Sequence, residues 1–416
     1  MIRRLYIFSL LASALLVLAA GHCTFAAESK KPAAAAQRPA VEYVPLDAPA
    51  GTSRAVIVDG QALAYTRQLL PLAADGKLVG KDAVEKQVEQ VLDNLDAVLK
   101  RAGADLNQLV RVNVYALAPS TTDLVREQLS KRLKPSVRPA LTSVLTPLPH
   151  RDALVAIDAV AIAPAKGESV TLLRCPQVSG EQDLADVAIL PHGGVAYISG
   201  MPADAGLTES AVDGSMTGLV KMLDNLKISL AQVAHIKVFL RPASSAADVS
   251  QKLHAYFPNQ RTPPVTFVEW LAPPPVEIEL VAQLPAGDKD APHVEYYNPP
   301  DVSPMQIFSR AALVHADRQI FVGGLFAEKA NGGQEQALNV FEQLQTILSK
   351  TGSDLQHLAK GTYYAVDDGS ARGLDRARLW LYDQDRPPAA SKCMVHGVGQ
   401  PDRTLTMDMI AVEADK

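Results

Sequence analysis

The chain has 416 residues, 48% of them hydrophobic and 20% charged, a composition that excludes a coiled coil, a collagen-like fibre and a disordered chain. Lys and Arg number 40 against 45 Asp and Glu, a net charge of −5, so no basic surplus is available to neutralise the phosphates of a nucleic acid. Single cores seldom grow beyond about 250 residues, and the length therefore predicts two to four domains.

The first 26 residues have the pattern of a secretory signal peptide. Arg3 and Arg4 form a positive start, an apolar stretch follows over 5–20, and Thr24-Phe25-Ala26 supplies small residues where a signal peptidase cuts. A membrane anchor is the alternative, although the apolar stretch is short for one. We therefore expect residues 1–26 to be cleaved and the mature protein to be periplasmic or secreted.

Residues 27–50 are expected to form a flexible leader, because they begin with a polar tract of Ala, Pro and Lys. No later apolar run reaches the roughly 18 residues that a membrane span requires, so no membrane association is expected after cleavage. Three cysteines are too few for a disulfide scaffold. In the mature chain, Cys175 and Cys393 either pair in an oxidising compartment or remain free, buried thiols.

Beyond the leader, the sequence repeats one succession of elements three times. Each copy has two strands, a long amphipathic helix, a strand with alternating apolar residues, a shorter helix and final strands. In the first copy, Gly103 stands where a glycine commonly ends a helix. The elements expected there are strands at 55–58 and 62–66, a helix at 82–102, a strand at 110–115, a helix at 121–132 and a strand at 153–162.

The second and third copies follow in the same order. The motifs Leu92-Asp-Asn-Leu95, Leu223-Asp-Asn-Leu226 and Phe341-Glu-Gln-Leu344 mark equivalent helix positions, 131 and then 118 residues apart. The second copy has expected strands at 187–190, 195–199, 233–240 and 276–282 and helices at 219–230 and 246–256. The third has strands at 307–314, 319–323, 358–366 and 404–412 and helices at 340–348 and 371–382.

The pattern β-β-α-β-α-β-β predicts an α+β fold with helices on one face of each sheet. We place the three units at 51–165, 182–286 and 293–413. The uncovered sheet face of each unit needs a partner, and three such faces can pack together about a common axis.

Several segments resemble the RidA family, which is also known as the YjgF or endoribonuclease L-PSP family and contains reactive-intermediate deaminases. The segments that carry the likeness are Asp75–Gly80, Val110–Tyr115, Val155–Ala161, Tyr197–Pro202, Val276–Ala282, Phe321–Gly324 and Leu405–Ala411. The family is typically a homotrimer with ligand clefts between neighbours. The resemblance therefore implies a monomer that acts as an intramolecular pseudo-trimer, with a small-molecule ligand in its inter-unit clefts.

In that family, an arginine in a Pro-Ala-Arg-Ser-x-Val segment holds the substrate carboxylate through a bidentate contact. The corresponding positions here hold Leu141 in the first unit, Val265 in the second and Lys392 in the third. Two clefts therefore lack the carboxylate anchor, and the third offers a point charge in place of a planar fork.

The family also uses a glutamate on its final strand to orient the water that hydrolyses an enamine or imine. Asp158, Glu279 and Asp408 occupy the matching place in the three final strands and are the candidate catalytic residues. The alternative is that each is an outward-facing carboxylate on an alternating strand.

The third unit offers the most complete candidate site. It combines Lys392 as anion anchor, His396 as acid or base, the adjacent Cys393, and Asp408 as the water-orienting group; ordinary polar residues on an exposed strand are the alternative. The resemblance further implies substrate contacts from Ser199, Gly200, Gly323 and Gly324. The nine histidines lack metal-ligand spacing, and no cofactor or metal is expected.

Two functions follow from these residues. The first is an exported hydrolase of small enamine or imine metabolites, resembling 2-aminoacrylate, that acts at an inter-unit cleft with a degraded site. The second is a non-catalytic protein of the same fold that binds a small molecule or a partner. Ribonuclease activity is a weaker third candidate, because the chain is acidic and lacks a basic aromatic surface.

Overall fold

A computed structural model describes residues 38–203, 208–285, 290–329 and 332–415. The expected signal peptide and residues 27–37 of the expected leader lie outside these residues. Within the described ranges, no helix combines the length and apolar character needed to cross a membrane.

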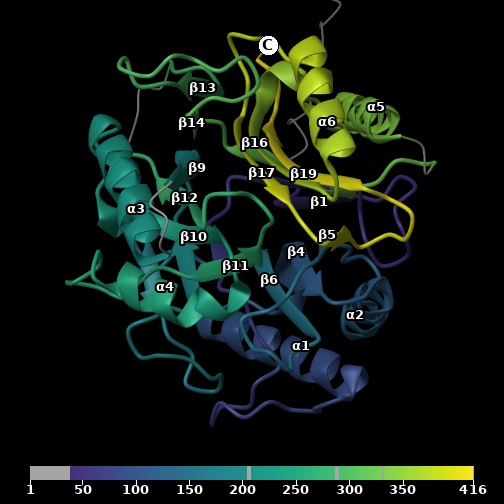
Figure 1. Ribbon diagram of the computed structural model, residues 1–416, viewed down its shortest axis with the longest axis vertical. Helices are drawn as coiled ribbons and strands as arrows, with labels where there is room; N and C mark the ends of the chain where they lie inside the picture. The colour runs from purple at the N-terminus through teal and green to yellow at the C-terminus, as the bar shows by residue number, and fades with distance from the viewer. Residues whose placement is uncertain (1–37, 204–207, 286–289, 330–331, 416) are drawn as a thin grey trace, which may run out of the picture. The chain divides into compact units, whose positions relative to one another are not determined.

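Each unit contributes one long and one short helix, as the sequence pattern predicted (Figure 1). In α1, apolar side chains at helical spacing, including Val88, Leu92 and Leu99, are fully buried, and Gly103 ends the helix in the left-handed conformation at φ 86°. The second long helix begins well before the expected residue 219, because its first turns are too polar and glycine-rich to show the apolar period. The helices are α1 (Val84–Ala102), α2 (Pro119–Arg132), α3 (Thr208–Asn225), α4 (Ala246–His254), α5 (Gly333–Thr351) and α6 (Asp368–Leu381).

The strands of the described residues form three mixed sheets. The first has the order β18-β5-β4-β6-β3-β8-β7, the second β11-β10-β12-β9-β14-β13, and the third β1-β2-β15-β19-β16-β17. The strands of the first sheet are β3 (Leu63–Thr66), β4 (Leu109–Ala116), β5 (Ala140–Leu145), β6 (Val155–Ile162), β7 (Thr171–Leu173), β8 (Val187–Leu190) and β18 (Gly397–Val398). Those of the second are β9 (Val195–Ala203), β10 (Val233–Leu240), β11 (Val265–Glu269), β12 (Val276–Gln283), β13 (Val294–Tyr297) and β14 (Ala311–Val314). Those of the third are β1 (Val41–Val44), β2 (Ala55–Asp59), β15 (Arg318–Leu325), β16 (Leu358–Ala365), β17 (Ala389–Met394) and β19 (Leu405–Val412).

The leading strand of each unit pairs with the sheet of another unit. β2 of the first unit pairs with β15 of the third, β8 of the second with β3 of the first, and β14 of the third with β9 of the second, all antiparallel. Both strands ahead of each long helix were expected to belong to one unit, but they lie in different sheets, so the expectation is wrong for the leading strand. The expected leader is also wrong in its last part, because Val41–Val44 form β1 beside β2.

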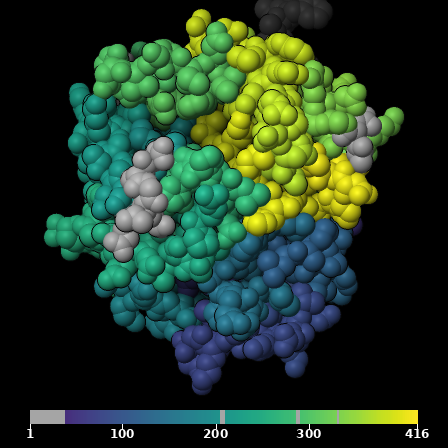
Figure 2. All heavy atoms as spheres, in the orientation of Figure 1, coloured from purple at the N-terminus to yellow at the C-terminus, as the bar shows by residue number. Residues whose placement is uncertain are grey.

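Helices cover one face of each sheet, and the opposite face packs against a core that the three sheets share. Three separate clusters join helices to sheets, whereas a fourth takes buried side chains from all three sheets, among them Val56, Tyr65, Val110, Tyr197 and Phe321. In the space-filling view, the third unit, in light green and yellow, abuts the first, in blue, and the second, in teal (Figure 2). The predicted α+β pseudo-trimer is confirmed.

The strand exchange predicts that a residue of the first unit stabilises the third. Ile57 is 3% exposed in the cluster under α5, so Ile57→Ala should lower the free energy of unfolding by about 2–5 kcal/mol. Urea unfolding measures this loss, with the half-exposed Leu46 changed to alanine as the control. Equal midpoints for the two variants would contradict the exchange.

Candidate functional site

The three units meet through equivalent pairs of strands, and strand register shows which residues correspond. Arg111 of β4 lies opposite Ala140 of β5, and Lys360 of β16 lies opposite Ala389 of β17. Counting from these pairs, Leu141 corresponds to Ala390, and Ser143 corresponds to Lys392.

Asp408 of the third unit is bound to the first unit by a buried ion pair. Arg111 Nη1 lies 3.1 Å from Asp408 Oδ1, and the two side chains are 7% and 3% exposed. Arg111 Nη2 also donates to the carbonyls of Met409, at 2.7 Å, and Val322, at 3.1 Å. Charge and directed hydrogen bonds thus hold the two units together.

Glu279 of the second unit is bound to the third in the same manner. Lys360 Nζ lies 2.6 Å from Glu279 Oε2, and Ser391 Oγ donates to the same oxygen. Burial acts to raise the pKa of Glu279, but Lys360 and Lys237 hold that pKa below its usual value. Glu279 is therefore ionised and fully engaged.

Asp158 of the first unit has uncharged partners. It accepts hydrogen bonds from Asn113 Nδ2 at 2.7 Å, Tyr115 Oη at 2.8 Å and Thr266 Oγ1 of the second unit at 3.0 Å. His235, which bonds to Thr266 at 3.2 Å, stays neutral because burial lowers its pKa to about 4. All three acidic candidates are thus buried at inter-unit contacts, which excludes the outward-facing alternative.

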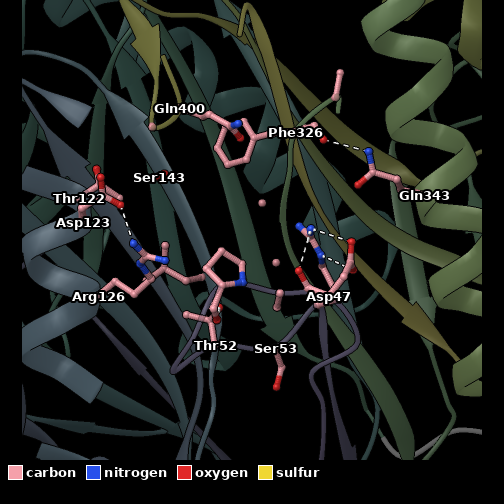
Figure 3. Close-up of a pocket in the computed structure, with 18 of the residues that line it drawn as sticks. Asp47, Thr52, Ser53, Thr122, Asp123, Arg126, Ser143, Phe326, Gln343 and Gln400 are labelled. Atoms are coloured by element: carbon pink, nitrogen blue, oxygen red, sulfur yellow. Dashed lines mark hydrogen bonds and ion pairs between the residues drawn. The ribbon is translucent and has the colours of Figure 1, made fainter. Parts of the chain in front are cut away.

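An open cleft of about 490 Å³ lies between the first and third units (Figure 3). Its floor includes Leu141 and two glycines of β15. A Cβ on Gly323 would lie 3.0 Å from the backbone nitrogen of Leu141, and one on Gly324 would lie 3.1 Å from Thr142 Cα. Glycine at both positions therefore lets β15 approach β5 closely.

The cleft walls carry paired charges and side-chain amides. Arg126 of α2 extends from the left wall in Figure 3 and bonds to Asp123 at 2.7 Å. Arg54 Nε donates to Asp47 Oδ1 at 3.1 Å. The side chain of Arg54 is 18% exposed and that of Asp47 is 81% exposed, so the guanidinium lies on the inner side of the pair. Further wall residues are Phe326, Gln343 and Gln400.

The sequence analysis missed these wall residues. They come from five separate places in the chain, around 47–54, 122–126, 323–328, 343 and 399–401, which only the folded chain brings together. No spacing along the chain marks them, so only Leu141, Gly323 and Gly324 on the floor of the cleft were identified.

At the other two junctions, direct hydrogen bonds join the strands that correspond to β5 and β15. Between the second and third units, Ala390 N donates to Ser199 Oγ at 2.8 Å, and Gly200 N donates to Ser391 Oγ at 3.2 Å. Between the first and second, Gln68 N donates to the carbonyl of Val265 at 3.0 Å. Ser199 and Gly200, expected to bind substrate, thus lie in contacts between units.

Known proteins similar to this chain resemble it over about one unit. Residues 44–163 match the family described as Endoribonuclease L-PSP. A RutC family protein of Pyrococcus abyssi is 28% identical over 92 residues, which are 22% of this chain and 72% of the relative. Residues 44–163, which hold most of the first unit, therefore match this family, the RidA (YjgF) family.

Solved structures of the family align with similar coverage. The Rid family protein YyfA of Yersinia pestis, titled a protein of unknown function, is 28% identical over 30% of this chain and 100% of its own, with a TM-score of 0.23. A YjgF family member of Neisseria meningitidis is 22% identical over 30% of this chain and 97% of its own, also with a TM-score of 0.23. The match of the first unit to the RidA family supports a small-molecule-binding or deaminase-type function.

The candidate site of the third RidA unit is not assembled. Ala390, not Lys392, corresponds to Leu141 and Val265, so the expected position of the anion anchor was wrong by two residues. Lys392 Nζ bonds to Asp375 of α6 at 2.6 Å. His396 Nε2 lies 3.1 Å from Glu269 Oε1. Asp408 is bound by Arg111, so the three candidate side chains have separate partners.

The remaining candidates differ in their surroundings. Cys393 is buried, which raises the pKa of its thiol well above the usual value, and both Cys175 and Cys393 are free. Within the described ranges, no group of three or more His, Cys, Asp and Glu side chains is placed to hold a metal ion.

Glu277 is a titratable residue that the sequence analysis missed. It lies on β12 against Gly200, where a Cβ would come within 1.9 Å of Glu277 Oε1. Burial and the neighbouring Glu279 raise the pKa of Glu277 to about 7, despite the opposing charge of Lys360. A carboxyl that titrates near neutrality can donate and accept a proton.

The buried Arg111–Asp408 pair predicts that removing one partner lowers the free energy of unfolding far more than replacing both. Arg111→Met leaves Asp408 buried without a cation and should cost about 3–5 kcal/mol of unfolding free energy. Arg111→Met combined with Asp408→Leu should recover most of that loss in urea unfolding.

Arg132→Met is the matched control, because its partner Asp93 is 62% exposed and such surface pairs contribute about 1 kcal/mol or less. An Arg111→Met variant no less stable than this control would show that the buried pair does not hold the units together.

The raised pKa of Glu277 predicts that the free energy of unfolding falls as the pH rises from about 4.5 to 7. The folded state binds the proton more tightly than the unfolded state, so above pH 7 the wild type carries a penalty of about 3 kcal/mol. Glu277→Gln removes the ionisation and should raise the melting temperature at pH 8 but not at pH 5. A shift of equal size at both pH values would contradict the raised pKa.

Proposed function

We propose that this protein binds a small carboxylate-bearing metabolite in the cleft between its first and third units and does not need to hydrolyse it. The observation that carries the proposal is the separation of that open cleft from the three candidate catalytic carboxylates. Asp158, Glu279 and Asp408 do not line it, and each is engaged in a contact between units.

Arg126 is the proposed anchor for the ligand carboxylate. Its side chain is 30% exposed and extends into the cleft, and it pairs with Asp123, which is 70% exposed. A guanidinium has five N–H donors, so several remain for a bidentate contact. The apolar side chain of Leu141 would contact the ligand's hydrocarbon part.

We further propose that the chain is exported after cleavage of residues 1–26 and acts as a monomer with its three units in one chain. The positive start, apolar stretch and small residues before Ala27 support the first point. The strand exchange among the three units supports the second, because it fills within one chain the contacts that a trimer makes between chains.

Ligand-observed NMR titration with propionate and pyruvate tests the binding. Arg126→Gln should weaken binding by one to two decades, because a charge-assisted contact contributes about 1.5–3 kcal/mol. Arg132→Gln, on the same helix, should leave the affinity unchanged. If neither carboxylate binds the wild type, or if both variants weaken binding equally, the proposal fails.

Imine or enamine hydrolysis is a second candidate function, and Glu277 is the observation that favours it. In this reaction, water adds to the imine carbon, the nitrogen accepts a proton and the amine departs. A carboxyl with a pKa of about 7 can supply the proton to nitrogen and recover one from water. The hydrogen-bonded strands at the second–third junction would have to separate to admit the substrate to Glu277.

Semicarbazide trapping of an enamine generated from an amino acid distinguishes the two functions. Hydrolysis requires the wild type to accelerate enamine loss over buffer and Glu277→Gln to abolish the acceleration. Binding alone predicts that the wild type has no effect on the rate while the NMR titration still saturates.

A further inference from the structure

The cleft between the first and third units does not end at Arg54. A second cavity of about 580 Å³ follows α5 and shares Asp47, Arg54, Glu328 and Gln343 with the first. The two cavities therefore form one continuous groove, which we name the α5 groove. It begins at Arg126 and reaches Lys350.

Two side-chain amides of α5 are held in fixed orientations on the wall of this groove. Gln343 Nε2 donates to the carbonyl of Phe326 at 2.9 Å and to Asn339 Oδ1 at 2.9 Å, and Figure 3 shows the first of these bonds. Asn339 Oδ1 also accepts from Glu328 N at 2.9 Å. Both amides are thus oriented before any ligand arrives.

These bonds use only one end of each amide. Among the interactions of the described residues, Gln343 Oε1 has no donor and Asn339 Nδ2 has no acceptor. One helical turn separates the two residues, and both are half-buried against the groove. The wall therefore presents one fixed acceptor beside one fixed donor.

A secondary amide has the complementary pair, one N–H and one C=O. A free carboxylate cannot donate, and an ester lacks the N–H. Between the two cavities, Arg54 is already paired with Asp47, and the carboxylate of Glu328 disfavours a second anion there. The middle of the groove thus suits a neutral polar group, whereas the Arg126 end suits an anion.

We propose that the α5 groove binds a short peptide-like carboxylate, with its carboxylate at Arg126 and an amide at Gln343 and Asn339. This inference rests on the proposed function of the cleft and extends it by naming the ligand class. Gln343 lines both cavities and Asn339 only the second, so chain length controls whether a ligand anchored at Arg126 reaches the amide pair.

The test compares propionate with N-acetylated alanine peptides of one to three residues, titrated into the full chain by ligand-observed NMR. Affinity should rise by about five- to tenfold at the length at which an amide reaches Gln343. The ester analogue of that peptide, with oxygen in place of the amide N–H, should lose this gain.

Asn339→Asp is the sharpest protein variant, because it keeps the Oδ1 acceptor and replaces only the free donor. It should weaken the longer peptide about five- to tenfold and leave propionate within twofold. Gln345→Glu adds the same charge to an exposed position of α5 that lines neither cavity, and it should change neither affinity.

The outcomes separate the two proposals. If propionate binds but amide and ester peptides bind equally, or if Asn339→Asp matches Gln345→Glu, the amide inference is overturned and the cleft function stands. If neither propionate nor any peptide binds, the cleft function is overturned and the amide inference with it.

Discussion

Burial of ionised groups between the units constrains the whole arrangement. The Arg111–Asp408 pair lies where the first unit meets the third, and the Lys360–Glu279 pair lies where the third meets the second. Each charge has its partner on another unit, so separating the third unit from either of the other two would leave an ionised side chain without compensation. The strand exchange and the shared apolar core stabilise the same contacts.

The three junctions are alike in backbone and different in side chains. One has an arginine with an aspartate, one a lysine with a glutamate, and one a neutral histidine and threonine beside an aspartate. In a homotrimer, symmetry places the same side chains at all three junctions, whereas in a single chain the side chains of each junction can differ. Here hydrogen bonds join the strands directly at two junctions, whereas at the junction of the first and third units two glycines of β15 help to form a cleft.

The units, their helices and most strands could be predicted because local periodicity determines them. The apolar stripe of α1 and the alternation in β4 are visible without any structure. Strand pairing is not, because nothing within 55–59 indicates that its neighbour is 318–325. The position of Lys392 was wrong by two residues because such a shift preserves the face of a strand and leaves the pattern unchanged. The walls of the cleft could not be predicted at all, because they combine segments far apart in the sequence.

The pairing of β2 with β15 also affects when the protein can fold. Ribosomes release a chain from its N-terminus, and domains that complete themselves locally fold in that order. β1 and β2 lie at the start of the described chain, yet their sheet needs strands between residues 318 and 412. The third sheet therefore cannot form until synthesis is nearly finished, and closing such a long loop slows folding. Three units that look like successive domains thus depend on one another, and the assembly of all three is complete only at the end of synthesis.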